Sequence, residues 1–338
     1  MSLKQQMEIM LPAIEAELQK QVARLDDVAT RPFHAMLTYH MGWTGEGAGP
    51  EARGKRIRPL LVLLTAASCT SPVWLHAAPA ASAVELVHNF SLVHDDIQDN
   101  SPRRRGRPTV WKKWNMPQAI NVGDALFVIS NLAIMDLAKN FPPEKVIRAA
   151  NVLHETCLAL TRGQFLDMSY EKRSDLTIED YWPMIEGKTA ALLSACTQIG
   201  AILGGADDST VEEYRIFGRD LGLAFQVQDD ILGIWGDEAL TGKSAASDLV
   251  EGKNSLPVLY GLSQGKRFAK RWAESAISPS EVADVAQMLV DEGALEYSKR
   301  EAERLTNQSL DALAKANPKG EAGKTLIDLA HKLLNRAS

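Results

Sequence analysis

The sequence has few cysteines and no long apolar run, and each absence removes a class of protein. Only three cysteines occur among its 338 residues, Cys69, Cys157 and Cys196, and they form no CxxC pair. Neither a disulfide framework nor a cysteine-based zinc site is predicted, and reduced thiols in the cytoplasm are expected. No uninterrupted apolar run reaches the ~18 residues expected of a membrane span, and the N-terminus lacks the apolar core of a signal peptide.

The chain also lacks an excess of positive charge. Its formal net charge is −6, which gives no general attraction to nucleic acid or to anionic membranes. Basic residues instead gather in two short runs, Lys55-Arg56-Ile57-Arg58 and Arg103-Arg104-Arg105-Gly106-Arg107. Either run alone is equally well explained as a solvated basic face. Because the rest of the protein is acidic, however, two short basic runs suit small anions better than long polyanions.

Alternating strand patterns are scarce, whereas helical periodicity runs through most of the chain. In residues 3–25 apolar side chains recur every three or four positions. Breakers such as Ser101-Pro102 and Gly204-Gly205 separate helical segments, and Ser174-Asp175-Leu176-Thr177 has the composition of a helix start. No linker divides regions of different composition. The sequence therefore predicts one all-α domain over residues 1–338, a single large helical bundle.

Two acidic clusters give the strongest functional signal. Asp95, Asp96 and Asp99 follow one apolar, helix-compatible stretch, and Asp229-Asp230 follows another. Asp95 and Asp99 are four residues apart, so on a helix they share one face, where their charges repel unless a cation is present. Hard cations such as Mg²⁺ take oxygen ligands. Two such clusters on central helices that face each other would hold several Mg²⁺ ions and, through them, a diphosphate.

Taken in order from about Gly54 to Tyr260, the motifs resemble those of the trans-isoprenyl diphosphate synthases. That family condenses isopentenyl diphosphate with an allylic diphosphate. The resemblance implies a helical bundle of the isoprenoid synthase type with a central cavity, a set of three Mg²⁺ ions, and a homodimer.

In the family, the basic motif Gly54-Lys55-Arg56-Ile57-Arg58-Pro59 grips isopentenyl diphosphate through its lysine and its second arginine, here Lys55 and Arg58. The two side chains provide a point charge and a bidentate fork for phosphate oxygens. His88 and Arg105 match further residues of the same subsite. His88 stands seven residues before Asp95, nearly two helical turns, and so lies on about the same face, roughly 10 Å away.

The acidic motifs match the metal-binding motifs of the family. By resemblance, Asp95, Asp99 and Asp229 ligate Mg²⁺, and Asp96 and Asp230 support them. Further catalytic or allylic-diphosphate contacts are implied for Arg104, Lys188, Thr189, Gln226, Lys243 and Lys253. Ionisation of the allylic C–O bond creates a carbocation and a pyrophosphate, and this ring of cations would stabilise the leaving group.

The chain departs from the family pattern at a few positions. The second motif usually carries a third aspartate where this chain has Gly233. That position is an outer-shell one, so altered affinity is expected rather than lost chemistry. Val110-Trp111 replaces a frequent histidine, and Asn254-Ser255 stands where a threonine is common. None of these changes removes an inferred metal ligand.

Product length in the family depends on the bulk beneath the first acidic motif. Phe90 lies five residues before Asp95, roughly 7.5 Å along a helix axis, and Ser91 lies four before it. One aromatic floor beside a small residue resembles enzymes that stop near C20. We therefore expect geranylgeranyl diphosphate, with farnesyl diphosphate (C15) or a longer product as the alternative. Simple core packing would also account for Phe90.

Other functions explain less of the sequence. Residues 236–244 resemble a P-loop but have five residues between the glycines instead of four and no strand-to-helix context. A metal phosphohydrolase could use His94-Asp95, yet it would leave Asp96 and the distal acidic pair unexplained. A class I terpene cyclase shares the first acidic motif but does not need the isopentenyl-binding elements. A non-catalytic subunit of a heteromeric prenyl synthase usually loses metal aspartates, which are present here.

Overall fold

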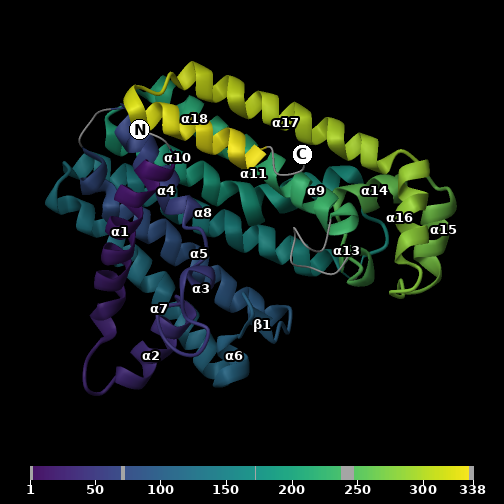
Figure 1. The fold of residues 1–338 in the computed structure, drawn as a ribbon, viewed down its shortest axis with the longest axis horizontal. Helices are drawn as coiled ribbons and strands as arrows, with labels where there is room; N and C mark the ends of the chain where they lie inside the picture. Colours follow the sequence, from purple (N-terminus) through teal and green to yellow (C-terminus); the bar gives the residue numbers. More distant parts are fainter. Residues whose placement is uncertain (1–2, 70–72, 172, 237–246, 335–338) are drawn as a thin grey trace. The chain divides into compact units, whose positions relative to one another are not determined.

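The computed structural model describes residues 3–69, 73–171, 173–236 and 247–334, and almost all of the regular structure within them is helical (Figure 1). Up to the middle of the chain the elements are α1 (Leu3–Val22), η1 (Ala23–Leu25), α2 (Arg31–His40), α3 (Pro50–Arg53), α4 (Ile57–Cys69), η2 (Val73–Ala77), α5 (Ala78–Gln98), β1 (Arg103–Arg104), β2 (Arg107–Pro108), α6 (Val110–Lys113), α7 (Met116–Met135), η3 (Asp136–Lys139) and α8 (Pro143–Tyr170). The later elements are α9 (Ile178–Ile185), η4 (Glu186–Ala190), α10 (Ala191–Gly204), α11 (Asp208–Trp235), α13 (Ser247–Val250), α14 (Leu256–Ser263), α15 (Arg267–Glu274), α16 (Val282–Asp291), α17 (Ala294–Ala316) and α18 (Gly320–Leu334). The prediction of an all-α fold is confirmed.

The chain forms two compact units. The first contains Met1–Glu155, Ala195–Glu212 and Asn317–Leu326, and the second contains Thr156–Ser194, Glu213–Ala316 and Ile327–Ser338. The residues predicted to bind isopentenyl diphosphate, together with the first acidic motif, belong to the first unit. The second acidic motif belongs to the second unit. The expectation of a single domain, and of two acidic clusters that face each other, stays a prediction.

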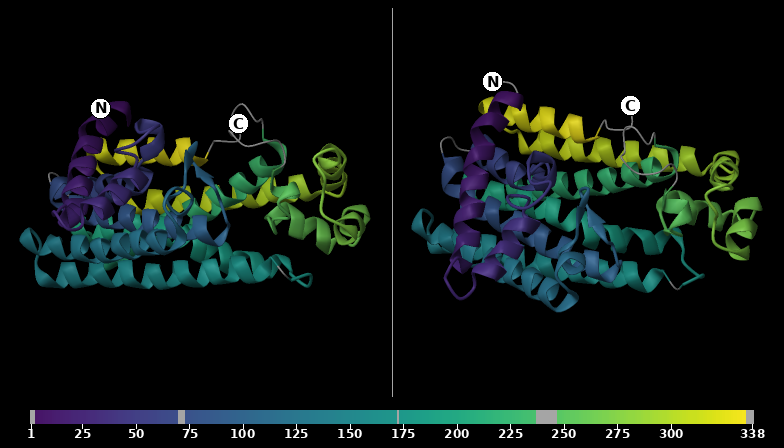
Figure 2. Two further views of the ribbon diagram at one scale, coloured as in Figure 1. Left: turned by 90° about the horizontal axis from the view of Figure 1, so that it is seen from below. Right: turned by 60° about the horizontal axis from the view of Figure 1, so that its bottom comes forward.

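In the first unit α5 packs along α7 and also contacts α4 and α1, and Figure 2 shows α5 and α7 side by side. Helix α7 begins where Asn115 accepts a hydrogen bond from the Gln118 N–H at 2.9 Å, with a proline in the first turn, where a missing N–H costs nothing. The first half of α5 is almost wholly buried, from Ala78 to Val87. The core of the unit thus fixes the helix that carries Asp95, Asp96 and Asp99.

The two described strands form a hairpin of two residues each, with Arg103 opposite Pro108 and Arg104 opposite Arg107. Its loop is Arg105-Gly106, and both residues have positive φ, 50° and 75°. Two consecutive left-handed residues make the tight turn that suits the right-handed twist of paired strands. The second basic run therefore folds back on itself and carries Arg104 and Arg105 at its tip.

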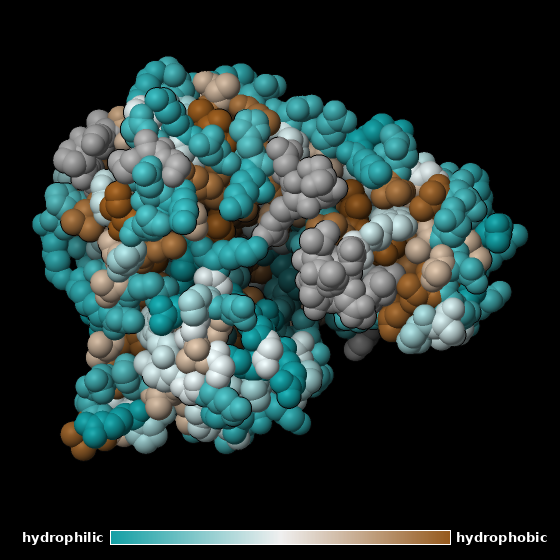
Figure 3. Space-filling view, in the orientation of Figure 1, coloured by the Kyte–Doolittle hydropathy of each residue, from teal (hydrophilic) through white to brown (hydrophobic). Residues whose placement is uncertain are grey.

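In the second unit α14 packs against α9, α15, α16 and α17, over an apolar core that includes Val258, Phe268 and Leu289. Helix α17 is amphipathic, and on the face shown in Figure 3 its side chains are mostly hydrophilic. Helix α9 begins at a capping box, in which the Asp180 carboxylate accepts hydrogen bonds from the N–H and hydroxyl of Thr177, both at 2.9 Å. The helix start inferred from residues 174–177 is confirmed.

The backbones of α8 and η4 approach each other closely, and this contact positions Lys188, a predicted site residue of the second unit. A Cβ on Gly163 would lie 2.2 Å from the Lys188 backbone nitrogen, and one on Gly187 would lie 2.7 Å from the Ala159 carbonyl oxygen. Only glycine lets the two backbones meet at this distance. The element η4 is a π-helical turn, a form that often occurs at functional sites, and it carries Lys188 and Thr189.

One helical stretch among the described residues, Met116–Lys139, is long and apolar enough to cross a membrane by length and composition alone. In its most apolar window 44% of the residues are buried inside the protein. A core helix of a globular protein meets the same test, and this stretch packs along α5. The expectation of no membrane span stays a prediction.

Candidate active site

The first acidic motif lies at the C-terminal end of α5. The Asp99 N–H donates to the Asp95 carbonyl at 2.9 Å, so helical spacing holds through the motif and the two aspartates share a face. Asp99 is exposed and Asp95 is half-buried, whereas Asp96 is buried. The two predicted ligands are thus the accessible members of the motif, and the predicted supporting residue is the enclosed one.

Arg104 binds both aspartates of the first pair. Its Nε donates to Asp96 Oδ1 at 2.7 Å and its Nη2 donates to Asp95 Oδ2 at 3.1 Å. Burial raises the pKa of Asp96 to about 6, and the Arg104 ion pair opposes this rise. Asp96 and Arg104 also line a pocket with His40 and Arg105. The hairpin tip therefore brings two arginines to the first acidic motif.

The residues predicted to bind isopentenyl diphosphate come together in the first unit. Arg58 Nη1 lies 3.4 Å from His88 Nε2, and Arg105 Nη1 donates to the Ala52 carbonyl at 2.9 Å. The Arg105 guanidinium rests on Gly54, where a Cβ would lie 2.7 Å from Cζ. Gly54 thus allows the hairpin arginine to approach the first basic run, next to Lys55.

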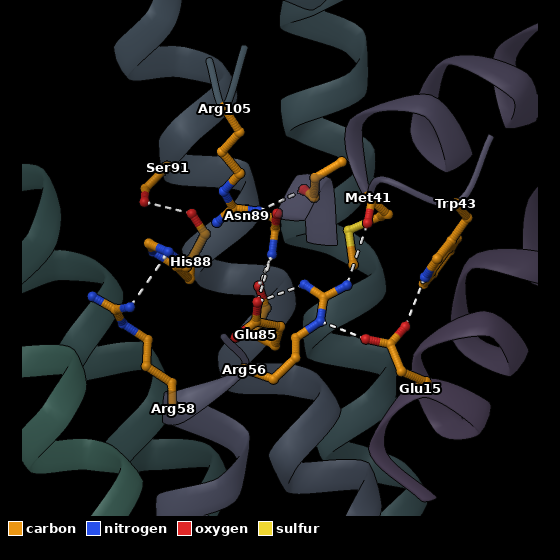
Figure 4. A network of polar contacts seen from close by, with 11 residues as sticks. Glu15, Met41, Trp43, Arg56, Arg58, Glu85, His88, Asn89, Ser91 and Arg105 are labelled. Atoms are coloured by element: carbon orange, nitrogen blue, oxygen red, sulfur yellow. Dashed lines mark hydrogen bonds and ion pairs between the residues drawn. The ribbon is translucent and has the colours of Figure 1, made fainter. Parts of the chain in front are cut away.

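Buried Arg56 organises this cluster (Figure 4). Its Nε donates to Glu15 Oε1 and its Nη1 to Glu85 Oε1, both at 2.7 Å, and its Nη2 donates to the Met41 carbonyl at 3.3 Å. The indole N–H of Trp43 donates to the other Glu15 oxygen at 2.7 Å. Arg56 is 4% exposed and has a φ of 50°, so two carboxylates hold a strained residue in place.

The same cluster determines the charge of His88. Burial lowers the pKa of His88 well below its usual range, and Arg58, Arg105, Arg104 and Arg56 lower it further. The imidazole is therefore neutral at pH 7. Burial also lowers the pKa of Arg105, and the neighbouring arginines add to this effect. Guanidinium groups gathered around a neutral imidazole form a region of positive potential that suits an anion.

The second acidic pair, on α11, repeats the pattern of the first. Asp229 is exposed, whereas Asp230 is 6% exposed. Asp230 accepts hydrogen bonds from the Tyr181 hydroxyl at 2.7 Å, from Gln226 Nε2 at 2.9 Å and from the Leu256 N–H at 3.0 Å. Burial raises the pKa of Asp230 to about 6, and these hydrogen bonds lower it. As in the first motif, one carboxylate, that of Asp229, is accessible, and its neighbour, that of Asp230, is held by hydrogen-bond donors.

The remaining predicted residues of the second unit lie near this pair or beside α8. The Thr189 hydroxyl donates to Gln226 Oε1 at 2.8 Å, so a chain of hydrogen bonds runs from Thr189 through Gln226 to Asp230. Lys188 forms a short ion pair with Asp167 of α8. These contacts connect three of the predicted catalytic side chains through direct hydrogen bonds.

Lys253 pairs with Glu251 at 2.9 Å and with Asp248 at 3.5 Å. Burial alone would lower the pKa of Lys253, but the Asp248 and Glu251 carboxylates outweigh it and raise that pKa, so the ammonium is charged at pH 7. Lys243 lies outside the described residues, and its predicted role stays untested.

The donor set fits a magnesium ion held jointly with a substrate. Within the described residues no group of three or more histidine, cysteine, aspartate or glutamate side chains is placed to hold a metal ion by itself. Mg²⁺ usually keeps several waters and binds through one or two carboxylates together with substrate phosphates. In the first unit Asp95 and Asp99 provide two carboxylates on one helical face, and in the second unit Asp229 is an accessible carboxylate.

Sequence reasoning did not identify several residues that organise the site. Glu15 and Glu85 hold Arg56, Tyr181 holds Asp230, and Asp167 pairs with Lys188. Each is distant in sequence from its partner, by 21 to 49 residues. No local spacing pattern could have pointed to them.

Comparison with known proteins identifies the family to which the chain is similar. A sequence model described as polyprenyl synthetase matches residues 49–291. The chain is 37% identical over 328 residues to a (2E,6E)-farnesyl diphosphate synthase of Mycobacterium tuberculosis, covering 94% of this chain and 89% of the relative. It is also 37% identical over 312 residues to a geranylgeranyl diphosphate synthase of the same species, covering 90% and 87%.

The fold has close counterparts among solved structures. A polyprenyl synthetase from Streptomyces coelicolor superposes with a TM-score of 0.88 at 35% identity, covering 98% of this chain and 99% of that one. A geranylgeranyl pyrophosphate synthetase from Pyrococcus horikoshii gives the same TM-score at 31% identity. The family resemblance inferred from the motifs is confirmed.

The depressed histidine pKa values predict a loss of stability in mild acid. In the unfolded chain His88 and His40 bind protons as the pH falls through about 6.5. In the folded protein they do not, because burial and nearby arginines lower both pKa values. The pKa of His40 falls to about 3, and that of His88 falls well below its usual range. The stability that these groups contribute is present above pH 6.5 and is lost below it. Between pH 7.5 and 5.5 we expect the free energy of unfolding of His88→Gln to fall by about 1 kcal/mol less than that of the parent protein. Urea unfolding at each pH measures this difference.

Exposed His331 supplies the control for this measurement. His331→Gln should follow the parent curve across the same pH range. Identical pH dependence of His88→Gln and the parent would show that His88 titrates alike in both states and would contradict the prediction.

Proposed function

This chain belongs to the polyprenyl synthetase family, and we propose that it condenses isopentenyl diphosphate with an allylic prenyl diphosphate to give a short-chain all-trans product. The observation that carries the proposal is the occurrence of two acidic motifs, each with an accessible carboxylate and one buried carboxylate held by donors, in a chain whose first unit also gathers a cluster of arginines. The relatives named as farnesyl and geranylgeranyl diphosphate synthases support the same reaction class. We take geranylgeranyl diphosphate as the expected product and farnesyl diphosphate as the alternative.

The arginine cluster is the proposed subsite for isopentenyl diphosphate. Arg58 and Arg105 offer planar forks for phosphate oxygens, and Lys55 offers a point charge beside them. Neutral His88 adds a hydrogen-bonding group without a further positive charge. Because burial and like charge already lower the pKa of Arg105, an arriving diphosphate relieves repulsion among these cations. A terpene cyclase has no need of such a second diphosphate subsite, and the cluster therefore favours condensation.

The proposed allylic subsite uses the acidic motifs and the cations near them. Asp95, Asp99 and Asp229 would hold the Mg²⁺ ions, which supply Lewis-acid stabilisation of the departing pyrophosphate. Arg104, Lys188 and Lys253 would bind the same diphosphate, by leaving or sharing their present carboxylate partners. The Thr189 and Gln226 side chains, fixed through Asp230, would face the reacting carbons. We further expect a cytoplasmic protein that binds no nucleic acid.

Purified protein with labelled isopentenyl diphosphate, Mg²⁺ and a C5, C10 or C15 allylic starter tests the reaction. We expect a linear C20 alcohol after dephosphorylation, and no product once EDTA has removed the metal. Asp95→Asn should lower kcat/KM at least 100-fold, since an accessible ligand carboxylate is lost, while the folding transition stays cooperative. A cyclic hydrocarbon from one prenyl diphosphate would support the cyclase. Activity only after mixing with a partner would support the regulatory subunit.

The floor that limits product length is proposed to include Phe90. Its ring lies 5.1 Å from that of Phe127 on α7 and 5.5 Å from that of His94, so a second helix supports it. Ser91 is the small neighbour, and its hydroxyl donates to the His88 carbonyl at 2.8 Å. A supported aromatic ring one and a half turns before Asp95 can stop a growing chain sterically.

Two variants change this floor in opposite directions. Phe90→Ala should lengthen the main product by at least one five-carbon unit, because the ring that blocks the chain is removed. Ser91→Phe should shorten it toward C15 by adding a second ring. Product sizing by chromatography checks both. Parental product from both variants would show that Phe90 serves core packing alone.

A homodimer is proposed through the exposed face of α7. Five exposed apolar side chains recur along it at helical spacing: Met116, Ile120, Val128, Leu132 and Met135. The stripe extends roughly 28 Å, and Asp124 is the one ionisable residue within α7. Contact with the same face of a second copy would therefore bury apolar surface with little repulsion between like charges.

The double variant Val128→Lys/Leu132→Lys should be monomeric by light scattering at micromolar concentration, where the parent should be dimeric. Lysines placed in the centre of a self-complementary apolar contact repel each other and lose hydration. Val290, 36% exposed on α16 of the second unit, gives the matched control, since Val290→Lys should leave the dimer intact. A monomeric parent would contradict the proposal.

A further inference from the structure

Arg107 is a buried residue of β2 whose side chain binds the end of α2 and the loop that follows it, residues 41–49. Its Nη1 donates to the Tyr39 carbonyl at 2.8 Å, its Nη2 to the Thr44 carbonyl at 2.7 Å and its Nε to the Glu46 carbonyl at 3.0 Å. Hydrogen bonds from a charged donor are stronger than neutral ones. One guanidinium therefore gathers three backbone carbonyls of a single segment and holds them against the hairpin.

The loop is shaped to fit around this side chain. Gly45 and Gly47 have positive φ, 84° and 69°. A Cβ on Gly47 would lie 3.3 Å from Arg107 Cγ, and a Cβ on Gly45 would lie 2.8 Å from Tyr39 Cδ2. The Arg107 guanidinium also lies over the Tyr39 ring, with Cζ 3.9 Å from its centre. Glycine thus lets the loop adopt left-handed turns and pass close to the arginine.

The same stretch of chain continues into the subsite proposed for isopentenyl diphosphate. A Cβ on Gly42, near the start of the loop, would lie 2.6 Å from the Ala52 backbone carbon, so the loop and α3 are in direct contact. The Ala52 carbonyl accepts a hydrogen bond from Arg105 Nη1 at 2.9 Å, and Lys55 follows three residues later. The hairpin therefore binds this stretch at two places, through Arg107 at the loop and through Arg105 at α3.

Arg104 and Arg105, the two arginines proposed to bind diphosphates, depend on this support to different degrees. Arg104 is paired with Asp96 at 2.7 Å and with Asp95 at 3.1 Å, and these carboxylates hold it from α5. Arg105 binds the Ala52 carbonyl, whose place is set by the loop. Neighbouring arginines repel the Arg105 guanidinium, so a carbonyl in a fixed position helps to keep it in place.

We propose that Arg107 is a positioning residue for isopentenyl diphosphate: by holding the loop against the hairpin, it fixes the Ala52 carbonyl and with it the orientation of the Arg105 guanidinium. The nitrogens of Arg107 are already used by the loop carbonyls, so it acts through Arg105 rather than on the diphosphate itself. This inference rests on the proposed function. It gives residues 41–53 a part in the isopentenyl diphosphate subsite, before the basic run itself begins.

Titration calorimetry of the purified full-length protein with isopentenyl diphosphate tests this role, together with the KM of each substrate in the condensation assay. Arg107→Lys should weaken binding of isopentenyl diphosphate about 10-fold and raise its KM similarly, because an ammonium keeps the charge but not the planar fork that reaches three carbonyls. Its kcat and its KM for the allylic diphosphate should stay within about 2-fold of the parent, because Arg104 keeps its carboxylates. Gly47→Ala, which crowds the loop against Arg107, should shift the same two values in the same direction.

Lys113→Gln provides the matched control, since the Lys113 ammonium lies 4.8 Å from the centre of the same Tyr39 ring. It removes a positive charge near the loop but leaves the Arg107 hydrogen bonds in place, so its affinity for isopentenyl diphosphate should equal that of the parent.

The inference is wrong if Lys113→Gln loses as much affinity as Arg107→Lys, if Arg107→Lys binds like the parent, or if both KM values rise equally. Circular dichroism and thermal unfolding confirm that each variant is folded, and if Arg107→Lys does not fold, Gly47→Ala decides by the same criteria. A parent protein that binds no isopentenyl diphosphate would instead overturn the proposed function.

Discussion

The buried pairing of Arg56 with Glu15 and Glu85 is the interaction on which the first unit's site depends. It ties the start of α4 to α1 and to α5, and its third contact reaches the Met41 carbonyl after α2. A guanidinium buried without partners would be very costly, and removal of one partner from a buried ion pair typically costs about 3–5 kcal/mol. The two glutamates therefore fix both the position and the strained backbone of Arg56, and with it the residues on either side.

Fixing Arg56 in this way makes a dense group of cations possible nearby. Arg58, Arg104 and Arg105 all lie close enough to depress the pKa of His88. Their mutual repulsion is a cost of folding, which the Glu15 and Glu85 carboxylates offset at Arg56 and which Glu85 also offsets in part at Arg105. A site that holds cations together before the ligand arrives needs little reorganisation when a diphosphate binds, which is the usual source of electrostatic stabilisation in enzymes.

Local patterns in the sequence were sufficient for the helices and for part of the site. Apolar periodicity predicted the all-α fold, and the four-residue spacing of Asp95 and Asp99 placed them on one face because both belong to the same helical segment. The contacts of Arg56, Lys188 and Asp230 could not be predicted in this way, because their partners lie on other helices. Packing in three dimensions brings these residues together, and their spacing in the sequence does not predict the contacts.

A similar limit applies at Gly233. The sequence showed that an aspartate of the family pattern is missing, and from this only an altered affinity was expected. In the fold, the side chain of Asp248 lies against the Cα of Gly233, where a Cβ would be 2.0 Å from Asp248 Oδ2. Asp248 lies fifteen positions after Gly233, so this contact could not be predicted from the local motif and is visible only in the fold.

The two acidic motifs share one design but differ in the donors that hold the buried carboxylate. Asp96 is held by Arg104, a charged group that also binds Asp95. Asp230 is held by neutral donors, a tyrosine hydroxyl, a side-chain amide and a backbone N–H. A diphosphate competes strongly for a guanidinium but only weakly for neutral donors already paired inside the protein. A diphosphate bound as proposed would therefore rearrange the first motif through Arg104, whereas the donors of the second motif would keep Asp230 in place.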